Sequence, residues 1–360
     1  MADREFPYGP DYATPPGASL RSTLEALGMT QAELAARADL SLKHVNQIVL
    51  GIAPLTPETA LSFEKVTGVS SKLWNQLEAN YRDQLARVED KESLSTDAEW
   101  LQELPINELR RRGVLSSTTD KSTLLQEVCR FFGVANRESW ERIWRQPLAS
   151  FKRSPGSDTA AVATWLRLGE LKAQNIECEP FDASTFRAAL RDIRSMTRST
   201  PAEFEPRLKG LCSKSGVALV FLPEIKGVKC WGAAQFLQPT KALIQLSLRY
   251  KKDDHLWFSF FHEAGHILLH SKKATFVSTD LSRDDAEEED EANAFAESFL
   301  IPKQYDARLR QLTFGEIPAF AEELGIAPGI VVGRLQKEGL LNWNQGHGLK
   351  RTFRFIEESE

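Results

Sequence analysis

The chain has 360 residues, of which 42% are hydrophobic and 26% are charged, and its formal net charge is −5. This balance is typical of a globular protein with two or three domains, and it excludes a protein that binds polyanions through bulk charge alone. No apolar run is long enough to span a membrane, and the first residues lack the apolar core of a signal peptide. We therefore expect a cytoplasmic protein without a membrane partner, whose four scattered cysteines are reduced.

The pattern of residue types divides the chain into four parts. They are a flexible arm rich in proline and glycine at 1–17, a set of short helices at 18–90, a helical middle region at 98–195, and a C-terminal domain with strands at 200–345. The charged stretch at 89–97 suggests a linker or a helix end, and Ser-Pro-Gly-Ser at 154–157 interrupts the middle region. The sequence thus predicts an α+β fold that is mostly helical.

The segment from 19 to 51 has the pattern of two helices joined by a tight turn. Thr30 and Glu33 form a capping box at the start of the first helix. A turn at 39–41 leads to a second helix over 41–50, which places valine and isoleucine on its inner face and ends at Gly51. This arrangement predicts a helix-turn-helix.

The second helix is a candidate for insertion into the major groove of a double-stranded DNA operator. The candidate DNA-binding residues are Gln31, Ser41, Lys43, His44, Asn46 and Gln47. Asn46 and Gln47 suit base edges, whereas Lys43 and Gln31 suit phosphates. Residues 1–90 hold 8 Lys and Arg against 12 Asp and Glu, a net charge of 8 − 12 = −4. DNA binding would therefore need a local patch or a dimer, and a bundle used for protein contacts is the alternative.

From about residue 200 the pattern changes to short β-type runs. Strand candidates lie at 217–222, 228–236 and 242–247, and an apolar helical segment follows them. We therefore expect a small sheet followed by a buried helix.

The apolar segment contains His-Glu-Ala-Gly-His at 262–266, the pattern H-E-x-x-H. Residues four apart share one helix face, so His262 and His266 can point at one metal ion, and Glu263 can take a proton from a water beside it. A buried helix that carries the pattern by chance is the alternative. However, two histidines and a glutamate in a buried helix need partners, and the pattern therefore favours a zinc hydrolase.

A third ligand is expected in the acidic stretch before a second apolar-faced helix. Glu291 is the predicted ligand because it leads that helix, and the rivals at 287–289 are interpreted as loop. Two histidines and one carboxylate leave a fourth position on zinc for water, which is the catalytic arrangement. His270 and Tyr305 are candidates for an oxyanion donor, and His270 is equally a candidate for a residue that supports a ligand.

Both ends of the chain resemble known families. Residues 15–85, with Met-Thr-Gln-Ala-Glu-Leu-Ala, resemble the Cro/CI-type (XRE) helix-turn-helix of HigA-like antitoxins. Residues from about 200 to 340 resemble the ImmA/IrrE metallopeptidases through H-E-x-x-H and the later Glu-Ala-Asn-Ala-Phe-Ala. The second resemblance implies a zincin-like domain with Zn²⁺ bound by His262, His266 and Glu291, Glu263 as general base, and proteolysis of a repressor.

Two hypotheses of function follow. The first is a DNA-binding regulator with a fused zinc endopeptidase that cleaves a repressor, a toxin–antitoxin partner or itself. The second is a regulator without proteolysis, whose peptidase-like domain senses a signal or binds a toxin. In either case a homodimer is expected because helix-turn-helix proteins usually bind paired half-sites. A second helix-turn-helix shape at 319–335 has few basic residues, and so suits packing or substrate recognition.

Overall fold

The computed structural model describes residues 13–95, 97–146, 148, 158–270, 272, 275–279 and 286–355. Contacts within the chain define two compact units, one up to residue 99 together with 118–126, and the other comprising 100–117 and the chain from 127 onward. No described helix combines the length and the apolarity needed to cross a bilayer. Most of the predicted arm lies outside the described residues, but its last two residues, Pro16 and Gly17, already belong to a helix.

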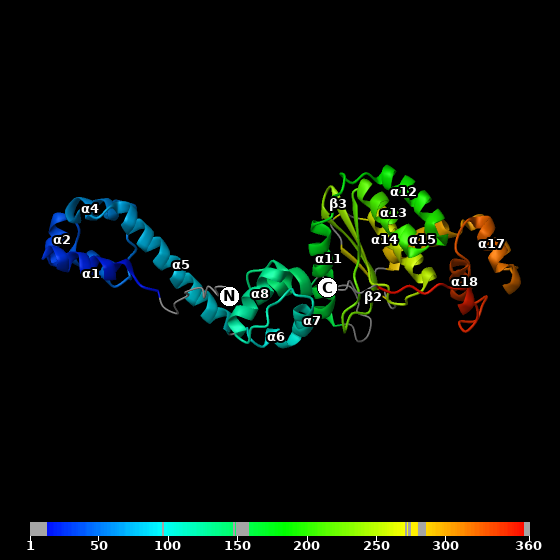
Figure 1. Cartoon of the computed structure of the whole chain (residues 1–360), viewed down its shortest axis with the longest axis horizontal. Helices are drawn as coiled ribbons and strands as arrows, with labels where there is room; N and C mark the ends of the chain where they lie inside the picture. The colour runs from blue at the N-terminus through cyan, green and yellow to red at the C-terminus, as the bar shows by residue number, and fades with distance from the viewer. Residues whose placement is uncertain are drawn as a thin grey trace, which may run out of the picture. The chain divides into compact units, whose positions relative to one another are not determined.

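The first unit is built from five helices (Figure 1), namely α1 (Pro16–Leu27), α2 (Gln31–Arg37), α3 (Leu42–Val49), α4 (Pro57–Thr67) and α5 (Ser71–Ser95). Their apolar faces form one core that includes Leu20, Leu34, Ile48 and Phe63. Close packing of α1 on α3 needs a residue without a side chain, because a Cβ at Gly17 would lie 2.0 Å from the Val49 carbonyl oxygen. The charged stretch at 89–97 is thus a helix end, since α5 continues to Ser95.

The predicted capping residues are in place. Thr30 N donates to Glu33 Oε2 at 2.8 Å, and Glu33 N donates to Thr30 Oγ1 at 3.2 Å. His44 N donates to Ser41 Oγ at 3.1 Å, so the Ser41 side chain caps α3. Between α2 and α3, Asp39 adopts a positive φ of 56°, which aspartate tolerates better than most residues. The turn and both caps confirm the predicted helix-turn-helix.

The second unit begins with short helices and continues with a sheet and its covering helices. The early elements are α6 (Trp100–Glu103), α7 (Ile106–Arg111), the second half of α8 (Lys121–Phe132), α9 (Arg137–Trp140) and the π-helical turn η1 (Glu141–Arg145). The next are α11 (Thr159–Gln174), α12 (Ala183–Ser195), η2 (Met196–Arg198), α13 (Pro201–Lys214), β1 (Val217–Phe221), β2 (Cys230–Gln238), β3 (Lys241–Leu246), α14 (Asp253–Leu269), β4 (Thr275–Thr279) and α15 (Ala286–Leu300). The last are η3 (Lys303–Tyr305), α16 (Asp306–Leu309), η4 (Phe314–Glu316), α17 (Ile317–Leu324), α18 (Pro328–Lys337) and η5 (His347–Leu349).

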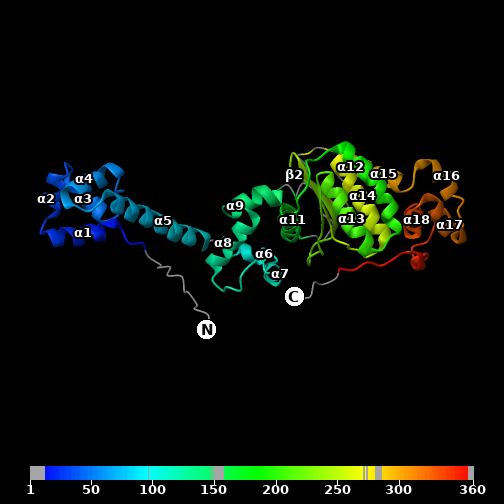
Figure 2. The same cartoon turned by 45° about the horizontal axis from the view of Figure 1, so that its top comes forward.

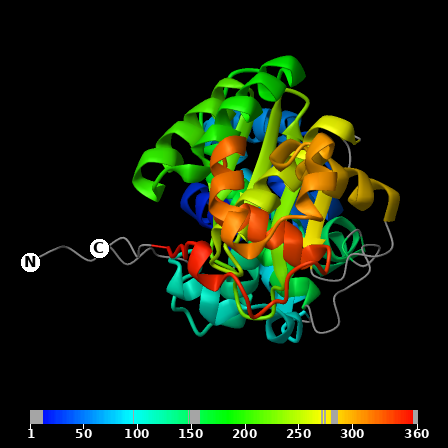
Figure 3. The same cartoon turned by 90° about the vertical axis from the view of Figure 1, so that its right-hand side faces the viewer.

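The four strands form one sheet in the order β1-β3-β2-β4. β1 runs parallel to β3, whereas β2 is antiparallel to both of its neighbours. α11 lies on one side of the sheet and α12 to α15 lie on the other (Figures 1 and 2). α18 packs against α14, and α17 packs against α18 (orange in Figure 3). These layers confirm a mostly helical fold with a small sheet.

Side chains alternate across the sheet, as the pleat requires. Leu219, Ala234 and Ile244 point to the core that they share with α14. Gln245 points to the opposite face, where its Nε2 donates to Trp165 O of α11 at 2.8 Å. Both faces of the sheet are thus covered, and α14 lies at the centre of the unit.

The predicted middle region at 98–195 is not a separate part of the molecule. Trp165 Nε1 of α11 donates to Leu222 O beyond β1 at 3.1 Å, and Arg194 Nη2 of α12 donates to Leu300 O at the end of α15 at 2.9 Å. The domain that contains the sheet therefore begins with α11 rather than near residue 200. The physical reason is that this sheet has an apolar surface on both faces and needs helices from both sides. The predicted break at 154–157 lies outside the described residues.

Candidate metal centre

α14 carries the H-E-x-x-H pattern into the middle of the second unit. Asp253 and Asp254 occupy its first turn, where negative charge suits the positive end of the helix dipole. His262, Glu263 and His266 lie further along and are 0%, 0% and 1% exposed. The structure therefore places all three predicted side chains together in a buried region.

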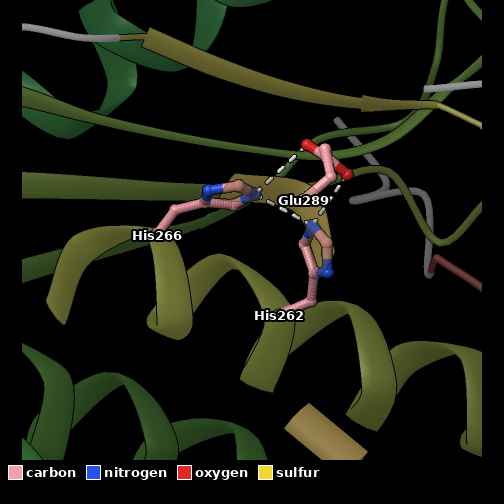
Figure 4. Close-up of side chains that lie close together, drawn as sticks. All are labelled: His262, His266 and Glu289. Carbon is pink, nitrogen blue, oxygen red and sulfur yellow. Dashed lines mark hydrogen bonds and ion pairs between the residues drawn. The ribbon is translucent and has the colours of Figure 1, made fainter. Parts of the chain in front are cut away.

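The two imidazoles converge with a carboxylate from α15 (Figure 4). His262 Nε2 lies 2.9 Å from His266 Nε2, and Glu289 places Oε2 3.5 Å from His262 Nε2 and Oε1 3.3 Å from His266 Nε2. Two ligand nitrogens on a tetrahedral zinc ion lie about 3.3 Å apart, given zinc–nitrogen bonds of about 2.0–2.1 Å. The three donor separations bracket this value, so these residues fit a zinc ion.

Partners on the far ring nitrogens orient both imidazoles. His262 Nδ1 lies 3.1 Å from Asn293 Oδ1, which can only accept, so Nδ1 carries the proton. His266 Nδ1 lies 2.9 Å from His270 Nδ1, and His270 Nε2 lies 3.1 Å from Glu291 Oε2. A consistent set of tautomers has each ligand histidine protonated at Nδ1. Each Nε2 lone pair then points at the candidate metal position, which is the usual arrangement of metal-binding histidines.

The structure differs from the sequence prediction in the identity of the carboxylate. Glu289, one of the rivals at 287–289, faces the histidines, whereas Glu291 pairs with His270 and its side chain is 55% exposed. The rivals were expected to lie in a loop, but α15 already begins at Ala286. Residues 289 and 291 differ by about 200° around a helix of 3.6 residues per turn, so they cannot share a face.

Glu263 lies beside the cluster against the sheet. A Cβ at Gly232 of β2 would lie only 2.2 Å from Glu263 Oε1, so the missing side chain at this position gives the carboxyl its space. Both carboxyl oxygens are buried without a hydrogen bond of normal geometry among the described residues, and the nearby Ser278 hydroxyl of β4 acts to lower the pKa of the carboxyl. Burial raises the pKa of Glu263 well above its usual value. A cation a few ångströms away would favour the ionised form of such a carboxyl.

Aromatic rings enclose the two histidines. Trp231 lies edge-on to His262 with ring centroids 4.7 Å apart, and Phe276 of β4 stacks on His266 at 4.3 Å. Burial, followed by the neighbouring His266, lowers the pKa of His262 well below its usual value. The site therefore favours the neutral imidazole that a metal ion requires.

The two predicted oxyanion candidates lie in different places. His270 caps the end of α14 and contacts His266, so its position supports a ligand. Tyr305 of η3 packs against Phe320 of α17, with ring centroids 5.9 Å apart. Sequence reasoning did not single out Gly232, Asn293 or Ser278. Asn293 lies within the Glu-Ala-Asn-Ala-Phe-Ala motif, and this was the one available signal for it.

Five of the six candidate DNA-binding residues lie on α3 or cap it, and Gln31 lies at the start of α2. Lys43 and Asn46 are exposed, whereas His44, Gln47 and Gln31 are half-buried. Val45, Ile48 and Val49 hold the opposite face of α3 in the core of the first unit. α3 thus presents a polar face outward, although Ser41 already uses its hydroxyl to cap the helix.

Comparisons with known proteins match both ends of the chain. Residues 20–74 match the family model for a helix-turn-helix, and residues 233–336 match a peptidase family model described as the IrrE N-terminal-like domain. Both matches confirm the resemblances predicted from the sequence. The chain therefore combines a DNA-binding type of domain with an IrrE-like domain of a peptidase family. No curated protein matches the chain.

Two solved structures of antitoxins are similar to part of the chain. One is an addiction module antidote protein of the HigA family from Coxiella burnetii, with 25% identity over 23% of this chain and 92% of that chain, and a TM-score of 0.22. The other is the Pseudomonas aeruginosa antitoxin HigA with the higBA promoter, with 23% identity over 23% of this chain and 90% of that chain, and also a TM-score of 0.22.

Proposed function

We propose that this protein is a DNA-binding transcriptional regulator with a fused zinc-dependent endopeptidase. Its substrate would be a repressor, another regulatory protein of the same circuit, or the protein itself. The observation that carries the proposal is the convergence of His262, His266 and Glu289 beside the buried carboxyl of Glu263. A structural zinc site would use four protein ligands, whereas these three leave one position for water.

His262, His266 and Glu289 would hold the zinc ion through two imidazole nitrogens and one carboxylate. A bound zinc ion would polarise the scissile carbonyl group and lower the pKa of a water towards neutrality. Glu263 would take the proton of that water as general base and pass it to the leaving amine as general acid. Gly232 leaves the space in which the Glu263 carboxyl sits, and Trp231 and Phe276 shield the site from bulk water.

The first unit would bind operator DNA through α3. Its exposed Asn46 would contact base edges together with Gln47, while Lys43 and Gln31 would contact phosphates. Two copies of the chain would bind the two half-sites of an operator, as helix-turn-helix dimers do. The match of residues 20–74 to a helix-turn-helix family supports this part of the proposal.

Replacement of Glu263 by Gln tests the proteolytic part. This change keeps the size of the side chain and removes the base, so zinc content and operator binding should stay at the wild-type level. Cleavage should fall at least about 100-fold, the range that a general acid–base group supplies. The measurements are metal content, operator binding by the purified chain, and release of the operator in cells with the regulatory circuit intact.

Wild-type behaviour of the Glu263→Gln variant in cells would contradict proteolysis. In that case the peptidase-like domain would act by sensing a signal or by binding a toxin. The matched control is Glu291→Gln, which removes a nearby carboxylate that lies on the other side of His270. Loss of a partner bonded directly to a ligand costs about 10–100-fold, but Glu291 touches only His270, which in turn contacts the ligand His266. The cleavage activity of this control should therefore stay within about tenfold of wild type.

A further inference from the structure

A cavity of about 240 Å³ opens in the second unit next to the candidate metal centre. α14, α15 and α18 form most of its walls, and Trp343, which follows α18 in the chain, also lines it. Its lining is mainly apolar and includes Trp231, Phe258 and Ile330. We call it the apolar cavity.

The apolar cavity lies one helical turn from the metal centre on α14, and α15 also contributes to both places. On α14, Phe258 lines the cavity and lies one helical turn before His262, with ring centroids 6.0 Å apart. On α15, positions 289, 293 and 297 follow one another at intervals of four. Glu289 faces the histidines, Asn293 bonds His262, and Glu297 lines the cavity. Trp231 belongs to both places, because it lines the cavity and contacts His262.

The charged groups around the apolar cavity neutralise one another. Glu297 pairs with Lys337 at 2.6 Å and with Arg334 at 2.9 Å, and Arg334 also pairs with Glu338 at 2.5 Å. Asp254 pairs with Lys350 at 2.5 Å, and Lys350 is only 5% exposed in its side chain. The Lys337 ammonium also lies 5.0 Å from the centre of the Phe258 ring. The cavity thus offers an incoming group aromatic and aliphatic surface and no excess of charge.

We propose that the apolar cavity receives a large apolar or aromatic side chain of the protein substrate, from a residue next to the scissile peptide bond. The inference rests on the proposed peptidase function. An extended peptide advances about 3.3 Å per residue, and one turn of α14 advances about 5.4 Å. If the scissile carbonyl of the substrate lies at the metal position, the side chain one or two residues along the substrate therefore reaches the cavity. Apolar cavities of about 150 Å³ in proteins bind benzene, so this one has room for a benzyl group.

Zinc-binding inhibitors can test which side chains the apolar cavity accepts, even though the protein substrate is unknown. Three hydroxamates that differ only in the side chain beside the chelating group, which is methyl, benzyl or 4-aminobutyl, are titrated into the zinc-loaded full chain by calorimetry. The benzyl compound should bind at least about tenfold more tightly than the methyl compound, because burial of an aromatic side chain is favourable to that extent. The 4-aminobutyl compound should not exceed the methyl compound.

Two variants test whether the preference for the benzyl compound arises in the apolar cavity. Trp343 is 63% exposed, so Trp343→Ala removes a cavity wall without opening the core. This change should reduce the preference for benzyl over methyl about threefold or more, since part of the buried apolar area is lost, and should leave the affinity for the methyl compound unchanged. The control is Phe314→Ala, which removes another exposed aromatic ring that does not line the cavity. It should change neither affinity.

The outcomes separate this inference from the proposed function. Equal binding of methyl and benzyl compounds by the zinc-loaded wild type would overturn the inference and leave the zinc site intact. Tighter binding of the 4-aminobutyl compound would also overturn it, because the cavity would then select a basic side chain. Failure of the purified chain to bind zinc would contradict the proposed function. Failure of all three hydroxamates to bind would overturn the cavity as a substrate pocket.

Discussion

Gly232 sets the position of the proposed general base. Replacement by Ala would place a Cβ 2.2 Å from Glu263 Oε1, so the carboxyl must move. Because a displacement of about 1 Å in an active site can cost about 100-fold in rate, Gly232→Ala should lower cleavage by about that factor. Zinc content should stay unchanged, since none of the three proposed ligands moves. The measurements are cleavage of the substrate and metal analysis.

Gly210→Ala is the matched control for Gly232→Ala. Gly210 lies on α13, where a new Cβ meets nothing within 4 Å, and alanine suits a helix better than glycine does. This variant should cleave as fast as wild type. Full activity of Gly232→Ala would show that Glu263 works from another position, and would contradict its assigned role.

The two histidines and Glu263 could be predicted from the sequence because their spacing alone puts them on neighbouring positions of one helix. For the carboxylate ligand the sequence pointed to Glu291 instead of Glu289, because the acidic stretch at 287–289 was interpreted as loop. Ala296 and Ala292 lie on the buried face of α15, and the next position on that face towards the N-terminus is Glu289. Following this face would have identified the residue that faces the histidines. The contact between His270 and Glu291 depends on the path of the chain between two elements, which no local pattern determines.

At the scale of single elements, α3 makes the DNA-binding part of the account testable. Combined replacement of Asn46 and Gln47 by Ala should relax the preference for the operator, because base contacts would be lost while phosphate contacts remain. Each good contact of this type contributes about 1–3 kcal/mol to discrimination. The ratio of operator to random-DNA affinity at fixed salt is the measurement. An unchanged ratio would favour a surface used for protein contacts.

The start of α12 gives a pH prediction. Asp182 caps this helix, and hydrogen bonds from Ser184 and Thr185 lower the pKa of its carboxyl from 3.8 to about 2. A carboxyl with a depressed pKa in the folded state stabilises the fold above its unfolded pKa, and this stabilisation disappears as the pH falls from about 4 towards 2. Asp182→Asn keeps a capping oxygen but cannot titrate.

Thermal unfolding at several pH values tests this cap. The wild type should unfold at a higher temperature than Asp182→Asn at pH 6, and the difference should shrink between pH 4 and pH 2. A difference that does not change with pH would show that the Asp182 charge does not stabilise the start of α12.

The elements differ in how far the sequence predicts them. β1, β2 and β3 follow from their apolar runs, although all three differ from the predicted bounds by one or two residues. β4 is only five residues long and contains Thr and Ser, so its run resembles a loop. The apolar residues of α11 predict a buried helix. They do not show that this helix packs on a sheet whose strands come later in the chain.

At the scale of the whole molecule, the two proposed activities use separate sets of residues. All candidate DNA-binding residues belong to the first unit, and all proposed zinc ligands belong to the second. The sequence predicted both types of domain, because each carries its own local motif. It did not predict the point at which the second begins, because the contacts that recruit α11 and α12 to the sheet join residues far apart in the chain.

Metal content of the purified full-length chain tests the central claim most directly. Plasma mass spectrometry should find about one zinc ion per chain in the wild type, little in His262→Ala and Glu289→Gln, and nearly the wild-type amount in Glu291→Gln. The contrast between the two glutamate variants follows from Glu289 facing both histidines and Glu291 contacting only His270. Absence of zinc from the wild type, or loss of zinc in Glu291→Gln with retention in Glu289→Gln, would contradict the metal centre described above.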